Sequence, residues 1–225
     1  EVVVPRERSR GVADLPAGVV AVRDVCASID DAVVRSLSSV VAAVDALHAG
    51  RFDEGWDVAR QRWFERQLAS GVVPEGTQLA PRNPGVDEWD ALPENQKKLA
   101  CRLQEAFAAF LDHTDDQIGR LVDGLRAMGQ LDNTVLLVLA DNGASQEGGP
   151  YGVMHEMKFF NGIFETPDEA VSRIDDIGGP DTHSNFPQGW AMASNTPLRR
   201  YKQNTHGGGI RDPLVISWPN ALPAR

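Results

Sequence analysis

The chain has 225 residues, a formal net charge of -10 and 42% hydrophobic residues, which suits one large or two small globular domains. The acidic balance argues against nucleic acid as a partner, because a phosphate backbone selects positively charged surfaces. No apolar run is long enough for a membrane span. The first residues lack the order of a signal peptide, which leaves the compartment, cytoplasmic or periplasmic, and the oligomeric state open. The two cysteines, Cys26 and Cys101, form neither a disulfide framework nor a zinc motif.

Residues 1–47 differ in composition from the rest of the chain. They contain thirteen valines and no Lys, Thr, Asn, Gln, His or aromatic residue, whereas a globular core normally uses aromatic side chains for buried area. Two interpretations remain open. The segment is a Val/Ala-rich part of a real domain, with residues 33–47 as a helix or strand, or it is not the natural continuation of residues 48–225, for example out-of-frame coding text.

Two helices are predicted in the next part of the chain. Charged residues alternate with aromatic ones at helical spacing over residues 56–68, which predicts an amphipathic helix. A long surface loop rich in Pro and Gly follows over residues 73–85. Apolar residues then recur every three or four positions over residues 95–128, which predicts the longest helix. Pro93 suits its first turn, and Gly129 is well placed to end it.

The longer predicted helix also carries a histidine among acidic residues. His113 lies near Asp112, Asp115 and Asp116, a grouping that invites a metal hypothesis. We interpret it instead as a solvated helical face with local pairing. Cys101, earlier in the same helix, is predicted to be a small packing residue.

The segment from Thr134 to Gly143 combines a strand with candidate metal ligands. Its five successive apolar residues, Val135 to Leu139, predict a strand buried on both faces inside a parallel sheet. Asp141 and Asn142 follow at the carboxyl end, where open α/β sheets bind ligands. They supply the hard oxygen ligands that Ca²⁺ or Mg²⁺ prefers, and Gly143 lets the chain turn away. Taken alone, Asp-Asn-Gly is more often a plain turn.

The remaining sequence predicts a long irregular excursion and a second strand. Residues 144–200 are rich in Gly, Pro, Ser and Asn, which is typical of functional lids or binding loops. Residues 214–218 are predicted to form a short strand. Because a helix over 95–128 leads directly into the strand over 134–140, the predicted fold class is α/β with a parallel, doubly wound sheet.

Taken together, these segments resemble the type I sulfatases, and the arylsulfatase branch in particular, over about residues 48–225. The matching stretches, in chain order, are Arg51–Asp57, Phe110–Leu121, Leu131–Gly149, Phe159–Gly162, Gly189–Ala191, Asn195–Leu198, Tyr201–Arg211 and Ile216–Pro219. So many ordered motifs are far more specific than any one of them.

The resemblance implies an alkaline-phosphatase-like α/β fold and the hydrolysis of small-molecule sulfate esters. It implies a formylglycine made from Cys or Ser, and a Ca²⁺ ion that polarises the sulfate and stabilises the formylglycine hydrate. By position, Asp141 and Asn142 would be two of the Ca²⁺ ligands. Lys202 would contact a sulfate oxygen and offset the developing charge, its alternative being a solvated surface cation. His206 would either donate a proton or hydrogen bond near the substrate or brace the turn that starts at Gly207.

The sequence departs from the family where the nucleophile belongs. Neither Cys26 nor Cys101 stands in the family motif Cys/Ser-x-Pro-x-Arg, and the N-terminal Asp pair and the Pro-His-x-Pro motif have no match. Two ligands leave the Ca²⁺ site incomplete, since this ion takes about six to eight oxygens. We therefore expect residues 48–225 to be a central part of a sulfatase catalytic domain that lacks N-terminal strands and the C-terminal domain, and to be inactive and marginally stable alone.

Three hypotheses about the function remain open. The chain could be a truncated remnant, a pseudoenzyme that binds sulfated ligands, or a phosphodiester or phosphonate hydrolase of the same superfamily. A phosphatase-like site with two metal ions usually needs more Asp and His residues than the Asp141–Asn142 pair offers.

Overall fold

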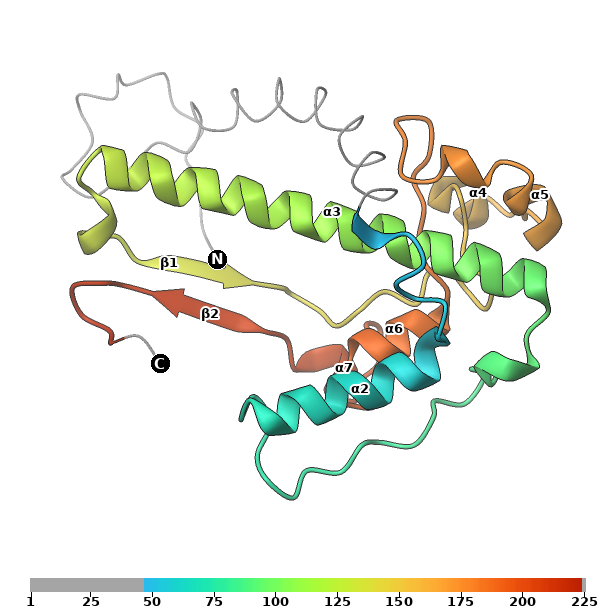
Figure 1. The fold of residues 1–225 in the computed structure, drawn as a ribbon, viewed down its shortest axis with the longest axis horizontal. Helices are drawn as coiled ribbons and strands as arrows, with labels where there is room; N and C mark the ends of the chain where they lie inside the picture. Colours follow the sequence, from blue (N-terminus) through green and yellow to red (C-terminus); the bar gives the residue numbers. More distant parts are fainter. Residues whose placement is uncertain (1–46, 224–225) are drawn as a thin grey trace.

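A long helix, α3, runs through the molecule and organises the other elements (Figure 1). The computed structural model describes residues 47–223, so the predicted segment 1–47 lies outside the described residues apart from Leu47. The elements are α2 (Gly55–Ala69), η3 (Trp89–Ala91), α3 (Glu94–Ala127), η4 (Leu131–Asn133), β1 (Leu136–Leu139), α4 (Glu156–Phe160), α5 (Pro167–Val171), η5 (Ile174–Asp176), α6 (Gln188–Ser194), α7 (Gly207–Ile210) and β2 (Leu214–Ser217).

Both predicted helices are confirmed. α2 covers the amphipathic stretch 56–68, and α3 covers 95–128 to within one residue at each end. Pro93 is the N-cap of α3. Gly129 follows its last turn with a φ of 66°, the left-handed conformation that commonly ends helices.

The core is an aromatic cluster between α2, η3 and α6. The ring centroids of Trp56 and Trp89 lie 4.8 Å apart, and each lies 6.0 Å from that of Trp190. The indole N–H groups of Trp56 and Trp190 donate to main-chain carbonyl oxygens over 3.2 and 3.0 Å. These three side chains therefore bury large apolar areas, and two of their three indole N–H groups keep a hydrogen-bond partner.

The two halves of α3 have different environments. Leu99 and Leu103 in its first half are buried against the aromatic core. Phe110, Leu111 and Leu121 continue the same apolar spacing but are 57%, 56% and 41% exposed. The periodicity therefore predicted the helix correctly, although these three side chains of its second half remain exposed while Leu125, near its end, is buried at 4% exposure.

The small sheet corrects the prediction made from the sequence. Strands were predicted at 134–140 and 214–218, and β1 and β2 lie there. They pair with each other in antiparallel fashion, with Val138 opposite Val215, so the strands among the described residues form neither a parallel pair nor a doubly wound arrangement.

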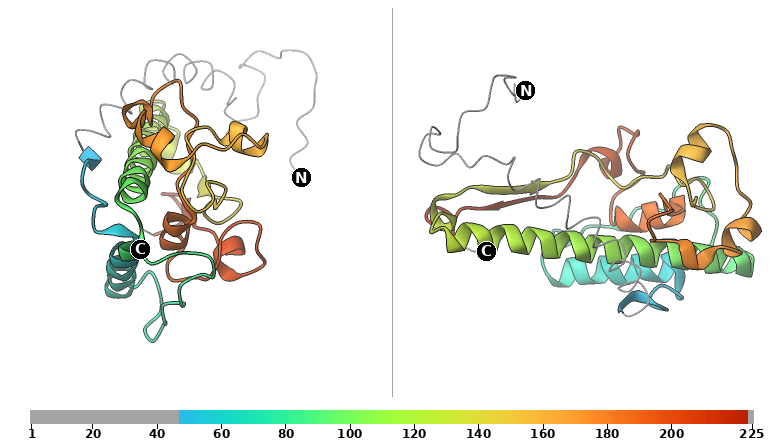
Figure 2. Two further views of the ribbon diagram at one scale, coloured as in Figure 1. Left: turned by 90° about the vertical axis from the view of Figure 1, so that its right-hand side faces the viewer. Right: turned by 90° about the horizontal axis from the view of Figure 1, so that it is seen from above.

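The expectation that the first strand is buried on both faces is also wrong for the described residues. Leu137, Val138 and Leu139 are 57%, 44% and 63% exposed. A run of apolar residues indicates a tendency to be buried, but the residues that cover it must come from elsewhere in the chain. β1 and β2 extend along α3 in two views (Figures 1 and 2), yet no other described strand lies beside them.

The segment between the strands includes the predicted excursion over residues 144–200. The short helices α4, α5 and α6 lie in that excursion and α7 follows it, and the segment returns the chain so that β2 runs antiparallel to β1. The described part of the protein is thus a mixed α/β structure with a small sheet. No helix within residues 47–223 is both long and apolar enough to cross a membrane.

Candidate active site

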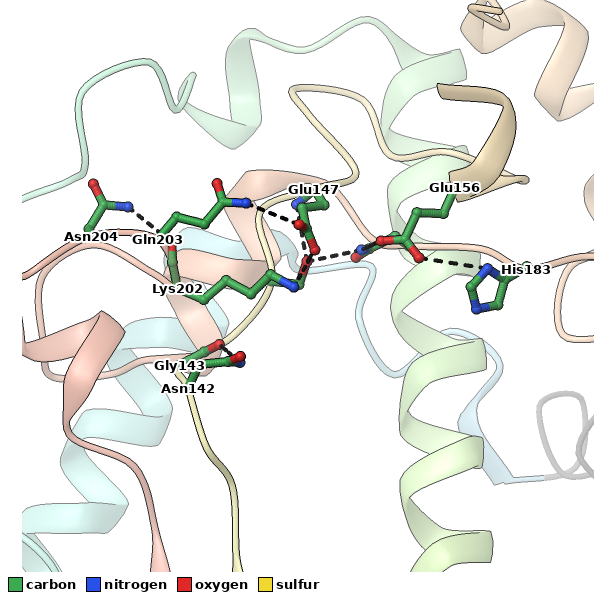
Figure 3. Close-up of polar contacts among 10 residues, drawn as sticks. Asn142, Gly143, Glu147, Glu156, His183, Lys202, Gln203 and Asn204 are labelled. Carbon is green, nitrogen blue, oxygen red and sulfur yellow. Dashed lines mark hydrogen bonds and ion pairs between the residues drawn. The ribbon is translucent and has the colours of Figure 1, made fainter. Parts of the chain in front are cut away.

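The segment after β1 carries two predicted site residues, Asp141 and Asn142. Both residues are exposed. The Asn142 side-chain amide donates to the Gly143 carbonyl oxygen over 3.0 Å (Figure 3). A carboxylate and an amide oxygen are ligands of the kind that Ca²⁺ prefers. Asp141 and Asn142 lie just beyond the carboxyl end of β1, which ends at Leu139, in the order that the sequence predicts.

Gly143 connects this segment to the glycine-rich turn at α7. Its N–H donates to the Gly209 carbonyl oxygen over 3.4 Å. A Cβ atom at Gly143 would lie 1.7 Å from the carbonyl oxygen of Gly208. The sequence suggested that Gly143 permits a turn, but the structure shows that the close approach of two backbones is what requires glycine here.

Lys202 lies on the loop that leads into α7. Its backbone N–H donates to the Ala144 carbonyl oxygen over 3.2 Å, which attaches this loop to the segment after β1. Arg200 and Gln203, on either side of it, have φ values of 69° and 70°. Such left-handed conformations are uncommon for residues other than glycine and often accompany functional sites.

The Lys202 ammonium forms an ion pair with the Glu147 carboxylate (Figure 3). The two side chains are 24% and 16% exposed, so Lys202 is not a freely solvated surface cation. The hydrogen bond from Lys202 lowers the pKa of Glu147 below its ordinary value of 4.5; partial burial opposes this effect, and a bond from Ser145 adds to it. Glu147 is therefore an anion at neutral pH.

The polar contacts continue from Glu147 to a third loop. Ser145 Oγ donates to Glu147 over 2.9 Å and accepts from the Asn185 amide over 3.0 Å. The same amide donates to Glu156 over 3.3 Å, and Glu156 lies 3.6 Å from His183 Nδ1. No local pattern in the sequence marks these residues as part of a site, because their contacts join segments that are far apart in the chain.

Asn195 fixes the relative position of the two loops. Its amide oxygen accepts from the Ala144 N–H over 3.0 Å, and its amide nitrogen donates to the Arg200 carbonyl oxygen over 2.9 Å. One sequence signal hinted at this role, since Asn195 begins one of the stretches that match the sulfatases. The side chain therefore connects the start of the Glu147 loop to the start of the Lys202 loop.

His206 precedes α7 and is exposed. Its carbonyl oxygen accepts from the Gly209 N–H over 2.8 Å, so its backbone braces the glycine turn. This contact involves only the main chain, and the role of the imidazole in proton or hydrogen-bond donation stays a prediction.

The described residues fit a calcium ion in ligand chemistry but not in ligand number. Asp141 and Asn142 supply two of the about six to eight oxygens that Ca²⁺ takes. Within residues 47–223 no group of three or more His, Cys, Asp or Glu side chains is arranged to hold a metal ion, and this includes the surroundings of His113.

Cys101 does not fit the precursor of a formylglycine. It lies buried in α3, where its thiol donates to the Phe52 carbonyl oxygen over 3.5 Å. Burial, reinforced by the nearby Asp53 and Glu105 carboxylates, raises the pKa of the thiol to about 12. The prediction that Cys101 is a packing residue is confirmed, and Cys26 lies outside the described residues.

Known proteins that are similar in sequence to this chain are sulfatases. The model of the sulfatase family matches residues 42–225. An uncharacterised sulfatase from Schizosaccharomyces pombe is 31% identical over 177 residues, which cover 76% of this chain and 30% of that protein. An arylsulfatase from Klebsiella aerogenes is 31% identical over 172 residues, which cover 76% of this chain and 35% of that protein.

The chain therefore belongs to the sulfatase family, whose members act on sulfuric esters. It spans about a third of the length of these two relatives.

Proposed function

We propose that the chain carries the metal-binding and sulfate-binding part of an arylsulfatase site, which hydrolyses sulfate esters of small molecules with the help of Ca²⁺. The observation that carries this proposal is the attachment of two loops. The loop with Asp141 and Asn142 and the loop with Lys202 are joined by backbone hydrogen bonds at Gly143 and Ala144. The arylsulfatase from Klebsiella aerogenes among the relatives supports the substrate class.

Each residue has a separate role in this proposal. Asp141 and Asn142 hold the calcium ion, which would polarise the sulfate group when bound. Lys202 donates hydrogen bonds to a sulfate oxygen and offsets the negative charge that grows there as the ester bond breaks. His206 donates a proton or a hydrogen bond to the leaving group.

The nucleophile is not among the described residues, and we derive no step through it. Among the described Cys and Ser residues, Ser217 comes nearest to the family motif, in Ser217-Trp-Pro-Asn-Ala221, which has Ala221 in place of the arginine. We therefore propose that this chain alone binds sulfate esters without turning them over.

The test is isothermal titration of the full chain with phenyl sulfate, with and without calcium chloride. We expect weak binding that calcium strengthens and that the Lys202→Gln variant reduces by about tenfold, since one charge-assisted contact is lost. Lys158→Gln is the matched control, because Lys158 also pairs with a carboxylate, Glu165, over 2.9 Å. Equal binding by Lys202→Gln and the wild type would contradict the assigned role.

Turnover is assayed separately with 4-nitrophenyl sulfate and 4-nitrophenyl phosphate. We expect release of 4-nitrophenol from neither. Hydrolysis of the sulfate would show that the chain has its own nucleophile, and hydrolysis of the phosphate would favour the phosphoester hydrolase instead.

A further inference from the structure

Glu147 holds the ammonium of Lys202 in one position. Its two carboxylate oxygens are both engaged: one interacts with Lys202 and with Ser145 Oγ at 2.9 Å, and the other accepts from Gln203 Nε2 at 3.0 Å (Figure 3). The backbone N–H of Glu147 also donates to Ser145 Oγ over 3.2 Å. A carboxylate with this many contacts is a fixed partner for the lysine.

The other end of the Lys202 side chain is fixed by the same segment. The backbone N–H of Lys202 donates to Ala144, three residues before Glu147. Asn195 connects Ala144 to Arg200 on the other side. The segment Ala144–Glu147 thus holds both the origin and the tip of a long, flexible side chain.

The ion pair leaves the ammonium able to bind a further group. A lysine ammonium has three N–H donors, and the contact with Glu147 uses one of them. Restricting the four-carbon stem before a ligand arrives removes part of the entropy cost of binding, since lysine has one of the largest rotamer entropies.

We propose that Glu147 is a positioning residue, which holds the Lys202 ammonium in place to contact the singly charged sulfate group of the substrate. This inference rests on the proposed function, because it takes Lys202 as the contact to a sulfate oxygen. It assigns Glu147 no contact with the substrate and no proton transfer.

A competing role for Glu147 predicts an effect of opposite sign. If the carboxylate only occupied the ammonium, its removal would free Lys202 and strengthen anion binding. If it positions the ammonium, its removal leaves the lysine charged but mobile, and anion binding weakens. The pair is partly shielded from solvent, at 24% and 16% exposure, and it is clamped by Ser145 and Gln203, which favours positioning.

The experiment compares Glu147→Gln with the wild-type full chain by two measurements. Nitrogen-15 NMR of the lysine ammonium groups reports their order, and the chain has only four lysines, at positions 97, 98, 158 and 202. Titration with phenyl sulfate reports binding. We expect lower order at Lys202 alone, and a dissociation constant about fivefold higher because of the rotamer entropy that must then be lost on binding.

Two further variants separate positioning from a general structural effect. Glu147→Asp keeps the charge and should restore most of the binding, whereas Glu165→Gln removes the partner of Lys158 and should leave binding unchanged. Far-UV circular dichroism confirms that each variant is folded. Tighter binding of phenyl sulfate by Glu147→Gln, or unchanged order at Lys202, would overturn the inference.

The same data distinguish a failure of this inference from a failure of the proposed function. If order at Lys202 falls in Glu147→Gln but phenyl sulfate binds neither protein, the proposed function fails, and with it the substrate part of the inference. If phenyl sulfate binds the wild type and Glu147→Gln equally well, while Lys202→Gln binds it more weakly, the proposed function stands and positioning by Glu147 is overturned.

Discussion

Gly143 lies directly against the backbone of Gly208, and a Cβ atom on Gly143 would lie 1.7 Å from the Gly208 carbonyl oxygen. This contact brings the end of the Asp141–Asn142 segment to the turn that His206 precedes. The spacing of the two loops therefore depends on the absence of a side chain at one position.

Replacing Gly143 by alanine should lower the free energy of unfolding by about 1–3 kcal/mol, the usual cost of forcing atoms into a packed site. The clash is with backbone atoms, which cannot rotate away as a flexible side chain would. Urea unfolding followed by tryptophan fluorescence measures the effect.

The matched control for that substitution is Gly124→Ala. Gly124 lies in α3, where a Cβ atom would meet nothing within 4 Å, so alanine there should raise stability by about 0.5–1 kcal/mol through helix propensity. If Gly143→Ala were as stable as the wild type, the two loops would not require the close approach.

The ionisation of Glu147 should appear in the pH dependence of stability. Because the bond from Lys202 lowers the pKa of Glu147 from 4.5, the folded state binds a proton less readily than the unfolded state. The ion pair therefore stabilises the protein fully above pH 4.5, and this contribution is lost as the pH falls through the lowered folded-state pKa.

The measurement is the free energy of unfolding of the wild type and of Glu147→Gln between neutral pH and about pH 3. We expect the difference between them to stay constant down to about pH 5 and to shrink below it. A difference that did not change over this range would mean that the carboxylate has an ordinary pKa in the folded protein.

Local features of the structure were predictable from sequence, and non-local ones were not. α3 follows from the spacing of residues such as Leu99 and Leu103, and α2 from the charged and aromatic residues over 56–68, since each spacing is a property of one segment. The pairing of Val138 with Val215 depends on where a chain segment 74 residues long returns. No local pattern records that direction, so the sequence did not predict that these two described strands pair in antiparallel fashion.

The site shows the same division. Asp141 and Asn142 were singled out by their place after an apolar run, and Lys202 and His206 by a resemblance between ordered motifs, and both signals are read from positions in the sequence. Glu147 lies within one of those motifs, but its partner Lys202 is 55 residues away, and neither composition nor periodicity indicates that the two meet. Residues that position others through side-chain contacts between loops became visible only in three dimensions.

The Cys101 thiol should be unreactive in the folded protein. With a pKa raised to about 12 by burial and nearby carboxylates, only about one thiol in ten thousand is ionised at pH 8. In a Cys26→Ser background, labelling by Ellman's reagent should be slow in buffer and fast in urea. Rapid labelling in buffer would show that the first half of α3 opens readily.

The exposed sheet should make the described structure prone to self-association. Val138 and Val215 lie opposite each other and are 44% and 60% exposed, and each strand has an outer edge without a partner among residues 47–223. Exposed apolar strands with open edges pair with other chains unless charges prevent it.

The Val138→Lys variant should therefore remain monomeric at concentrations where the wild type forms larger species in sedimentation velocity. Its stability should change by less than about 1 kcal/mol, because Val138 is exposed and lies outside the buried core. Identical sedimentation of the two proteins would mean that the apolar face of the sheet is covered in solution.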